Sequence, residues 1–174
     1  EHPNIHIKVT NSTSIGCVYL LENGQADLIV VNYPNSRLTN LVHRKPLRTF
    51  QDVFVASRRF FDLENVSLSL KDLQNYPILM LDRKSTTSEY LHQLFQQHQL
   101  DLVPEIELSS NDLLLDLASI GLGIAFVPDF FLDGKSQDLF RLNIREELPG
   151  RQLVLAYQEQ ILLPQAAAEF IRYF

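Results

Sequence analysis

Residues 78–128 decide the fold class, and they read ILMLDRKSTTSEYLHQLFQQHQLDLVPEIELSSNDLLLDLASIGLGIAFVP. Three short runs within them, residues 78–81, 105–108 and 124–127, have the apolar or alternating character of strands. Between these runs, two segments place apolar side chains at helical spacing. Strands that alternate with helices in this way favour an α/β fold built on a parallel sheet.

The N-terminal part repeats this alternation. Ile5–Val9 alternates apolar and polar residues, which predicts a half-buried strand. A helix is predicted over Ser14–Glu22, with Gly24 as its left-handed cap. Asp27–Val31 then has the composition of a fully buried strand, so the opening unit is predicted to be βαβ with a parallel sheet.

Further strands and helices are predicted outside these two regions. Val53–Ser57 and Leu153–Tyr157 have the composition of buried strands, and a short helix is expected after Ser69. Pro164 opens a last helix, because proline suits the first helical position. The sequence predicts one α/β protein with neither repeats nor a low-complexity linker.

Composition limits what the chain does. The formal net charge is −6, so a nucleic-acid surface is not expected on this chain, because phosphate contacts need concentrated Lys and Arg. Cys17 is the only cysteine, so a reducing compartment is the simpler assumption. No stretch approaches the roughly 18 apolar residues of a membrane span. The chain is therefore predicted to be cytoplasmic, without a membrane contact.

No catalytic, metal or cofactor site is predicted. The five histidines are scattered, without the spacing of a zinc-protease site. Gly121-Leu122-Gly123 lies between a helix and a strand, whereas a dinucleotide loop leads from a strand into a helix. These glycines are interpreted as a helix end and a tight turn.

Hydroxyl and amide side chains gather at three predicted strand-to-helix turns. They are Thr13 and Ser14, then Ser85, Thr86 and Thr87, and then Ser109, Ser110 and Asn111. In a parallel sheet these turns lie along the carboxyl edge, where ligands bind. Free backbone N–H groups and the helix dipole favour an anion there. The sequence therefore predicts a binding site for a small anion.

Two simpler interpretations stay open at this stage. The hydroxyls could only cap helices, and Thr86 with Glu89 has the spacing of a capping box. Ser85-Thr86-Thr87 nevertheless holds more hydroxyls than one cap uses. Arg83 lies near the same turn and is a candidate ligand contact, but an exposed salt bridge is the alternative.

Four motifs, in their order and spacing, carry a family resemblance. They are residues 2–7 (HPNIHI), 21–28 (LENGQADL), 70–73 with 76–78 (LKDL and YPI), and 118–128 (ASIGLGIAFVP). With them the chain resembles the effector-binding (substrate-binding) domain of LysR-type transcriptional regulators over almost its whole length. The resemblance implies a two-lobed, type-II periplasmic-binding-protein-like fold with parallel-type sheets and two crossover strands.

The resemblance also implies where the lobes divide. Lobe I would hold residues 1–55 plus 151–174, and lobe II would hold residues 56–150, with Val53–Ser57 and Leu153–Tyr157 as crossovers. The family's domain normally opens with a further strand and helix before the segment that begins this sequence. Lobe I is therefore expected to lack them.

The implied function is that of a sensor and not of an enzyme. Positions that match the family's effector contacts are Ser14, Ser85, Thr86, Thr87, Ser110 and Asn111, facing an inter-lobe cleft. A homodimer or tetramer is implied, with DNA contacted only through an N-terminal winged helix-turn-helix outside this sequence. The alternative is an enzyme, such as a prephenate dehydratase-like or phosphoribosyltransferase-like protein, or a solute receptor on a similar fold.

Overall fold

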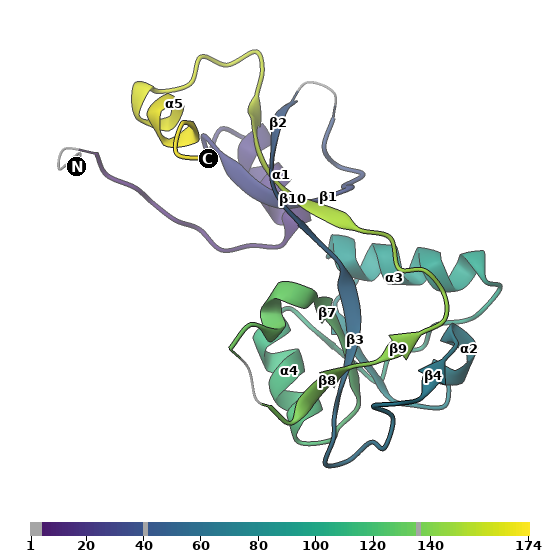
Figure 1. The fold of residues 1–174 in the computed structure, drawn as a ribbon. Helices are drawn as coiled ribbons and strands as arrows, with labels where there is room; N and C mark the ends of the chain where they lie inside the picture. Colours follow the sequence, from purple (N-terminus) through teal and green to yellow (C-terminus); the bar gives the residue numbers. More distant parts are fainter. Residues whose placement is uncertain (1–4, 40–41, 135–136) are drawn as a thin grey trace. The chain divides into compact units, whose positions relative to one another are not determined.

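The computed structural model describes residues 5–39, 42–134 and 137–174 (Figure 1). The chain divides into two units, one of Glu1–Thr49 with Gln152–Phe174 and one of Phe50–Arg151. The division before Phe50 comes earlier than the predicted boundary at residue 55. The reason is that the strand Asp52–Ser57 pairs inside the second unit. Each unit has its own sheet and core.

The first unit is built on a three-stranded sheet. Its elements are α1 (Ser14–Glu22), β1 (Ile29–Tyr33), β2 (Val42–Phe50), β10 (Arg151–Gln158) and α5 (Gln165–Ile171). The strand order is β1-β10-β2, and β1 runs antiparallel to β10, with Ile29 opposite Ala156. Val18 and Leu21 of α1 pack against this sheet in a small core.

The predicted helix α1 is confirmed at both ends. Thr13 caps it by accepting a hydrogen bond from the Gly16 N–H at 3.1 Å. The helix ends before Gly24, which has φ +65° and so adopts the left-handed conformation that suits glycine. Local cap chemistry accounts for both ends.

The predicted opening βαβ unit is wrong. Ile5–Val9 forms no strand, and Ile7 and Val9 are 69% and 87% exposed. An alternating pattern becomes a strand only when a neighbouring strand pairs with it. The sheet is instead completed by β2, where no strand was predicted, and by β10 from the far end of the chain. The motif residues His2, Pro3 and Asn4 lie outside the described residues.

The second unit holds a five-stranded mixed sheet of order β6-β5-β7-β3-β8. Its strands are β3 (Asp52–Ser57), β5 (Ile78–Leu81), β6 (Ile106–Leu108), β7 (Ile124–Pro128) and β8 (Leu139–Arg141). β5 runs parallel to both β6 and β7, as predicted for residues 78–128. β3 runs antiparallel to β7 and β8.

Helices cover both faces of this sheet. They are α3 (Thr86–Gln97) and α4 (Asn111–Ser119), while α2 (Leu70–Leu73), β4 (Ser67–Leu68), β9 (Asn143–Ile144) and the 3-10 turn η1 (Asp129–Leu132) complete the unit. Phe54 of β3 packs in the core that α3 covers, and its neighbour Val53 packs in the core that α4 covers. Successive side chains of a strand point to opposite faces, so one apolar strand serves both cores.

The antiparallel direction of β3 places its first residue at the edge of the sheet where the parallel strands β5, β6 and β7 end. Asp52, the first residue of β3, is paired with Pro128, the last residue of β7. Asp52 therefore lies at the edge where the parallel strands end. At the other end of the sheet, Gly121 has φ +85° and follows the last turn of α4, which confirms that it ends a helix and does not belong to a dinucleotide loop.

Candidate functional site

The start of α3 is buried and capped by Ser85. The Ser85 Oγ accepts a hydrogen bond from the Ser88 N–H at 3.0 Å. The cap is therefore one residue earlier than the predicted Thr86, and the predicted capping box of Thr86 with Glu89 is wrong. Because Ser85 takes the capping role, the hydroxyls of Thr86 and Thr87 are left for other partners.

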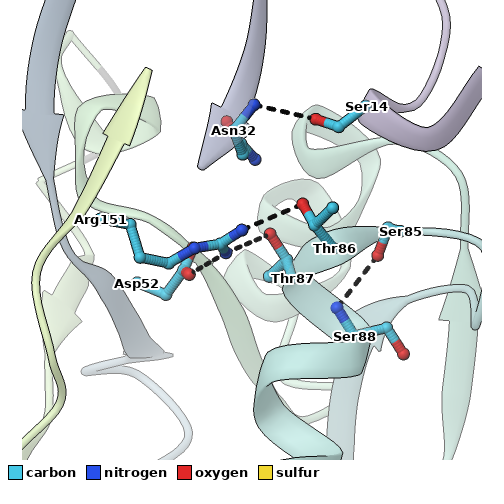
Figure 2. Close-up of polar contacts among 8 residues, drawn as sticks. All are labelled: Ser14, Asn32, Asp52, Ser85, Thr86, Thr87, Ser88 and Arg151. Atoms are coloured by element: carbon cyan, nitrogen blue, oxygen red, sulfur yellow. Dashed lines mark hydrogen bonds and ion pairs between the residues drawn. The ribbon is translucent and has the colours of Figure 1, made fainter. Parts of the chain in front are cut away.

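Those hydroxyls meet a buried arginine, as Figure 2 shows. The Arg151 Nη1 donates to Thr87 Oγ1 at 3.1 Å, and Nη2 donates to Thr86 Oγ1 at 3.0 Å. Nη1 also donates to Asp52 Oδ2 at 2.5 Å. Arg151 is 3% exposed and Asp52 is fully buried. A guanidinium is thus held against the positive end of a helix, which requires a compensating negative charge.

Asp52 supplies that charge, but only one of its oxygens is satisfied. Its Oδ1 is buried without a hydrogen-bond partner among the described residues. Burial raises the pKa of the Asp52 carboxyl above its ordinary value, and the adjacent Arg151 guanidinium only partly offsets this effect. The pair is therefore an ion pair with a spare buried acceptor.

Aromatic rings border the Arg151 guanidinium. The guanidinium carbon lies 5.5 Å from the ring centres of both Phe50 and Tyr90. Burial and the charge of Asp52 raise the pKa of Tyr90 to about 12, so its phenol is neutral at physiological pH. The Tyr90 hydroxyl is buried and has no partner in the described part of the chain.

This arrangement can bind a small polar molecule but shows no catalytic set. Thr86 and Thr87 accept hydrogen bonds from Arg151, so each hydroxyl hydrogen remains free to donate elsewhere. The first N–H groups of a helix have no intrahelical acceptors, which adds donors at the same place. Donors therefore dominate at the start of α3, and they suit an acid group.

The start of α4 resembles the start of α3 only in its cap. Ser110 accepts a hydrogen bond from the Leu113 N–H at 3.3 Å. The Asn111 Oδ1 is buried without a partner among the described residues. Because β5 and β6 are parallel neighbours, the two helices follow adjacent strand ends. An effector role for Ser110 and Asn111 stays a prediction.

Ser14 and Arg83 have partners of their own. In the first unit, the Ser14 Oγ accepts from the Asn32 N–H at 3.1 Å and so ties α1 to β1. The Arg83 Nε lies 3.8 Å from Glu107 Oε1, and the Arg83 side chain is 76% exposed. Arg83 thus forms the exposed salt bridge that was the alternative, and it is not among the residues that contact Arg151.

Sequence reasoning missed Asp52 and Arg151. They are the first residues of β3 and β10, and a charged residue beside a strongly apolar run is a usable signal. The resemblance implies only that Val53–Ser57 and Leu153–Tyr157 are crossover strands, and it does not give their direction relative to the parallel strands. The antiparallel pairing of β3 with β7 brings Asp52 to the start of α3.

The described residues form neither a metal-binding cluster nor a membrane-spanning helix. Among residues 5–39, 42–134 and 137–174, no three His, Cys, Asp or Glu side chains are grouped so that they could hold a metal ion. Within the same ranges, no helix has the length and apolar character needed to cross a membrane.

Comparison with known proteins places the chain in a family. The family model of the LysR substrate binding domain matches residues 1–174. The chain belongs to this family. A LysR substrate-binding domain is the ligand-binding part of a transcriptional regulator. The alternatives of an enzyme or a solute receptor therefore find no support.

Several relatives agree with this assignment. The HTH-type transcriptional activator CmpR of Synechocystis is 26% identical over 178 residues, which cover 99% of this LysR domain and 57% of CmpR. The CcmR regulatory domain of Synechocystis, solved in complex with 2-PG, has a TM-score of 0.88 at 22% identity, with 99% and 83% of the two chains covered. The effector-binding domain of QuiR with shikimate has a TM-score of 0.77 at 18% identity, with 93% and 76% covered.

These comparisons confirm two expectations from sequence. The resemblance to the effector-binding domain of LysR-type regulators is confirmed, and so is the two-lobed, periplasmic-binding-protein-like α/β fold. The LysR domain described here spans little more than half of the curated relative that it matches.

Proposed function

We propose that this LysR domain is the sensor of a cytoplasmic transcriptional regulator and that it binds a small anionic effector at the start of α3. The observation that carries the proposal is the buried Arg151 guanidinium between Thr86 Oγ1 and Thr87 Oγ1. Thr86 and Thr87 are neighbours in the sequence, whereas Arg151 comes from a distant segment and meets them at a helix N-terminus. An acid group there would gain charge-assisted hydrogen bonds.

A helix cap alone would not need this arrangement. Ser85 already satisfies the Ser88 N–H, so Thr86 and Thr87 are not required as caps. A buried arginine loses its hydration, and an anionic ligand would restore favourable interactions for it in a site of low dielectric. The helix dipole adds to this preference.

The relatives support a small-molecule effector. CcmR was solved with 2-PG and QuiR with shikimate, which is a carboxylate. CmpR is a transcriptional activator of the HTH type, which supports contact with DNA through a separate helix-turn-helix part. Assembly as a homodimer or tetramer is part of the proposal and rests on the family resemblance. To switch such a regulator, the effector must bind one arrangement of the protein more tightly than another.

A thermal-shift screen tests the proposal. The 174-residue chain is heated with small carboxylates, amino acids, sulfate and phosphate, and so are Thr87→Val and the control Ser69→Ala, which removes the cap of α2. An effector at 100 times its Kd should stabilise the protein by about 2.7 kcal/mol. We expect Thr87→Val to abolish the ligand-induced shift and Ser69→Ala to retain it.

Two outcomes would contradict the proposal. If no compound of the panel stabilises the chain, the start of α3 is not an anion site. If a compound stabilises Thr87→Val as much as the unaltered chain, the ligand binds elsewhere and the hydroxyls of α3 serve only the packing of Arg151.

A further inference from the structure

The unsatisfied oxygen of Asp52 is not explained by binding of an anion alone. Asp52 is fully buried, and its Oδ2 is occupied by Arg151 at 2.5 Å. Its Oδ1 has no hydrogen-bond partner within the described residues. An ionised oxygen that is buried without a donor is costly, so such an atom in a native protein indicates a missing partner.

Asp52 also affects how an anion can bind to Arg151. Arg151 and Asp52 together carry no net charge, so a bare anion that approaches Arg151 also approaches a buried carboxylate. Repulsion between two like charges a few ångströms apart is strong where water is excluded. A ligand that also carries a hydrogen-bond donor would turn this repulsion into a contact with Oδ1.

Other groups next to the pair do not replace that donor. The Thr86 and Thr87 Oγ atoms bond with Arg151 rather than with Asp52. The Tyr90 ring lies 5.5 Å from the Arg151 guanidinium carbon, and its hydroxyl is buried without a hydrogen-bond partner in the described part of the chain. The surroundings of the pair thus contain one further polar atom that a hydroxyl or ammonium group could satisfy.

We infer that Asp52 determines specificity: the site takes an acid anion that carries a hydroxyl or ammonium group beside its acid group. The acid group binds Arg151 and the start of α3, and the adjacent donor binds Asp52 Oδ1. This inference rests on the proposed function, because it concerns the same site. A pair with a purely structural role would not distinguish acids with a donor from acids without one.

Three acids of nearly equal size test the inference. Propanoate has no donor, lactate adds a hydroxyl and alanine adds an ammonium group at the same carbon. Their dissociation constants for the 174-residue chain are measured by isothermal titration calorimetry. A hydrogen bond to a charged group discriminates by about ten-fold or more, so we expect lactate or alanine to bind at least that much more tightly than propanoate. The preferred acid identifies the donor.

Asp52→Asn is the decisive variant, because it keeps the side-chain shape and removes the charge. We expect it to bind propanoate more tightly than the unaltered chain does and to lose most of the preference for lactate or alanine. Asp129→Asn is the matched control: Asp129 lies near enough to raise the pKa of Asp52 but is not a partner of Arg151 in the contacts described here. This control should keep the preference.

The outcomes separate this inference from the proposed function. Equal binding of all three acids, or binding of phosphate or sulfate alone in a manner abolished by Thr87→Val, overturns the role of Asp52 and leaves the anion site intact. Failure of every acid and inorganic anion to bind overturns both. If Asp52→Asn does not fold, the comparison of the three acids on the unaltered chain still decides.

Discussion

The starts of α3 and α4 share their local chemistry and differ in their long-range partners. Both helices follow neighbouring parallel strands, and both are capped by a serine, Ser85 or Ser110. Thr86 and Thr87, behind the first cap, are buried and contact Arg151. Asn111, behind the second cap, has a buried Oδ1 without a partner among the described residues.

This difference shows that a polar helix start is not in itself a binding site. Capping stabilises the helix equally well with or without a ligand nearby. What distinguishes α3 is a cation brought from residue 151 and a carboxylate brought from residue 52. If this long-range pair is what distinguishes α3, substitutions in the pair and its partners should lower stability more than matched substitutions at the start of α4.

The largest effect is expected from Arg151→Met. This substitution leaves Asp52 buried without its partner, which should lower the free energy of unfolding by about 3–5 kcal/mol. Urea denaturation measures the change. The control is Arg145→Met, since Arg145 is exposed in the same unit and its guanidinium donates to the Ser67 carbonyl. Similar losses in both variants would show that the Arg151–Asp52 pair has no special role.

A smaller decrease in the free energy of unfolding is expected from Thr86→Val. This substitution keeps the side-chain shape but removes the Oγ1 that accepts a hydrogen bond from Arg151. The unmet guanidinium donor should cost about 1–3 kcal/mol of the free energy of unfolding. Asn111→Ala, at the same helical position of α4, removes an oxygen that bonds to no described residue and should cost less. The comparison fails if Asn111→Ala is the more damaging change.

Substitution of the two capping serines should lower the free energy of unfolding by amounts that differ only modestly. Loss of a serine cap costs about 0.5–2 kcal/mol, and we expect Ser85→Ala near the upper end and Ser110→Ala near the lower end. The reason is that Ser85 is 5% exposed, whereas Ser110 is half-buried and its bond is longer, 3.3 Å against 3.0 Å. Chemical denaturation of both variants gives the order, and the reverse order would refute this explanation.

The smallest effect is expected from Arg83→Ala. The Arg83 side chain is 76% exposed and pairs with Glu107 at 3.8 Å, so the free energy of unfolding should change by no more than about 0.5 kcal/mol. Ligand-induced thermal shifts should also be unchanged. If Arg83→Ala loses the ligand-induced thermal shift, Arg83 contacts the effector, as the sequence predicted.

Elements with strong local signals were predicted well from sequence. The bounds of α1 and β5 agree with prediction, because the residues that define them are close together in the sequence. Ile5–Val9 failed, because strand formation needs a pairing partner that its own pattern cannot specify. The cap of α3 was placed one residue late, since Ser85, Thr86 and Thr87 all have suitable side chains.

The candidate site was predicted only in part, for a related reason. Its hydroxyls lie next to one another in the sequence, and their position before a helix indicated an anion site. Asp52 and Arg151 are 99 residues apart and lie in strands whose directions the sequence pattern did not reveal. Their meeting depends on the antiparallel pairing of β3 with β7, which reverses the edge at which Asp52 lies.

The sequence by itself determined the α/β class, the family resemblance and the hydroxyl-rich start of α3, because each follows from residue types and their spacing along the chain. Only the tertiary structure decided that α3, and not α4, carries a buried ion pair at its start. The physical reason is that burial and charge pairing depend on strand order and direction, and these are settled only when segments far apart in the sequence pack together.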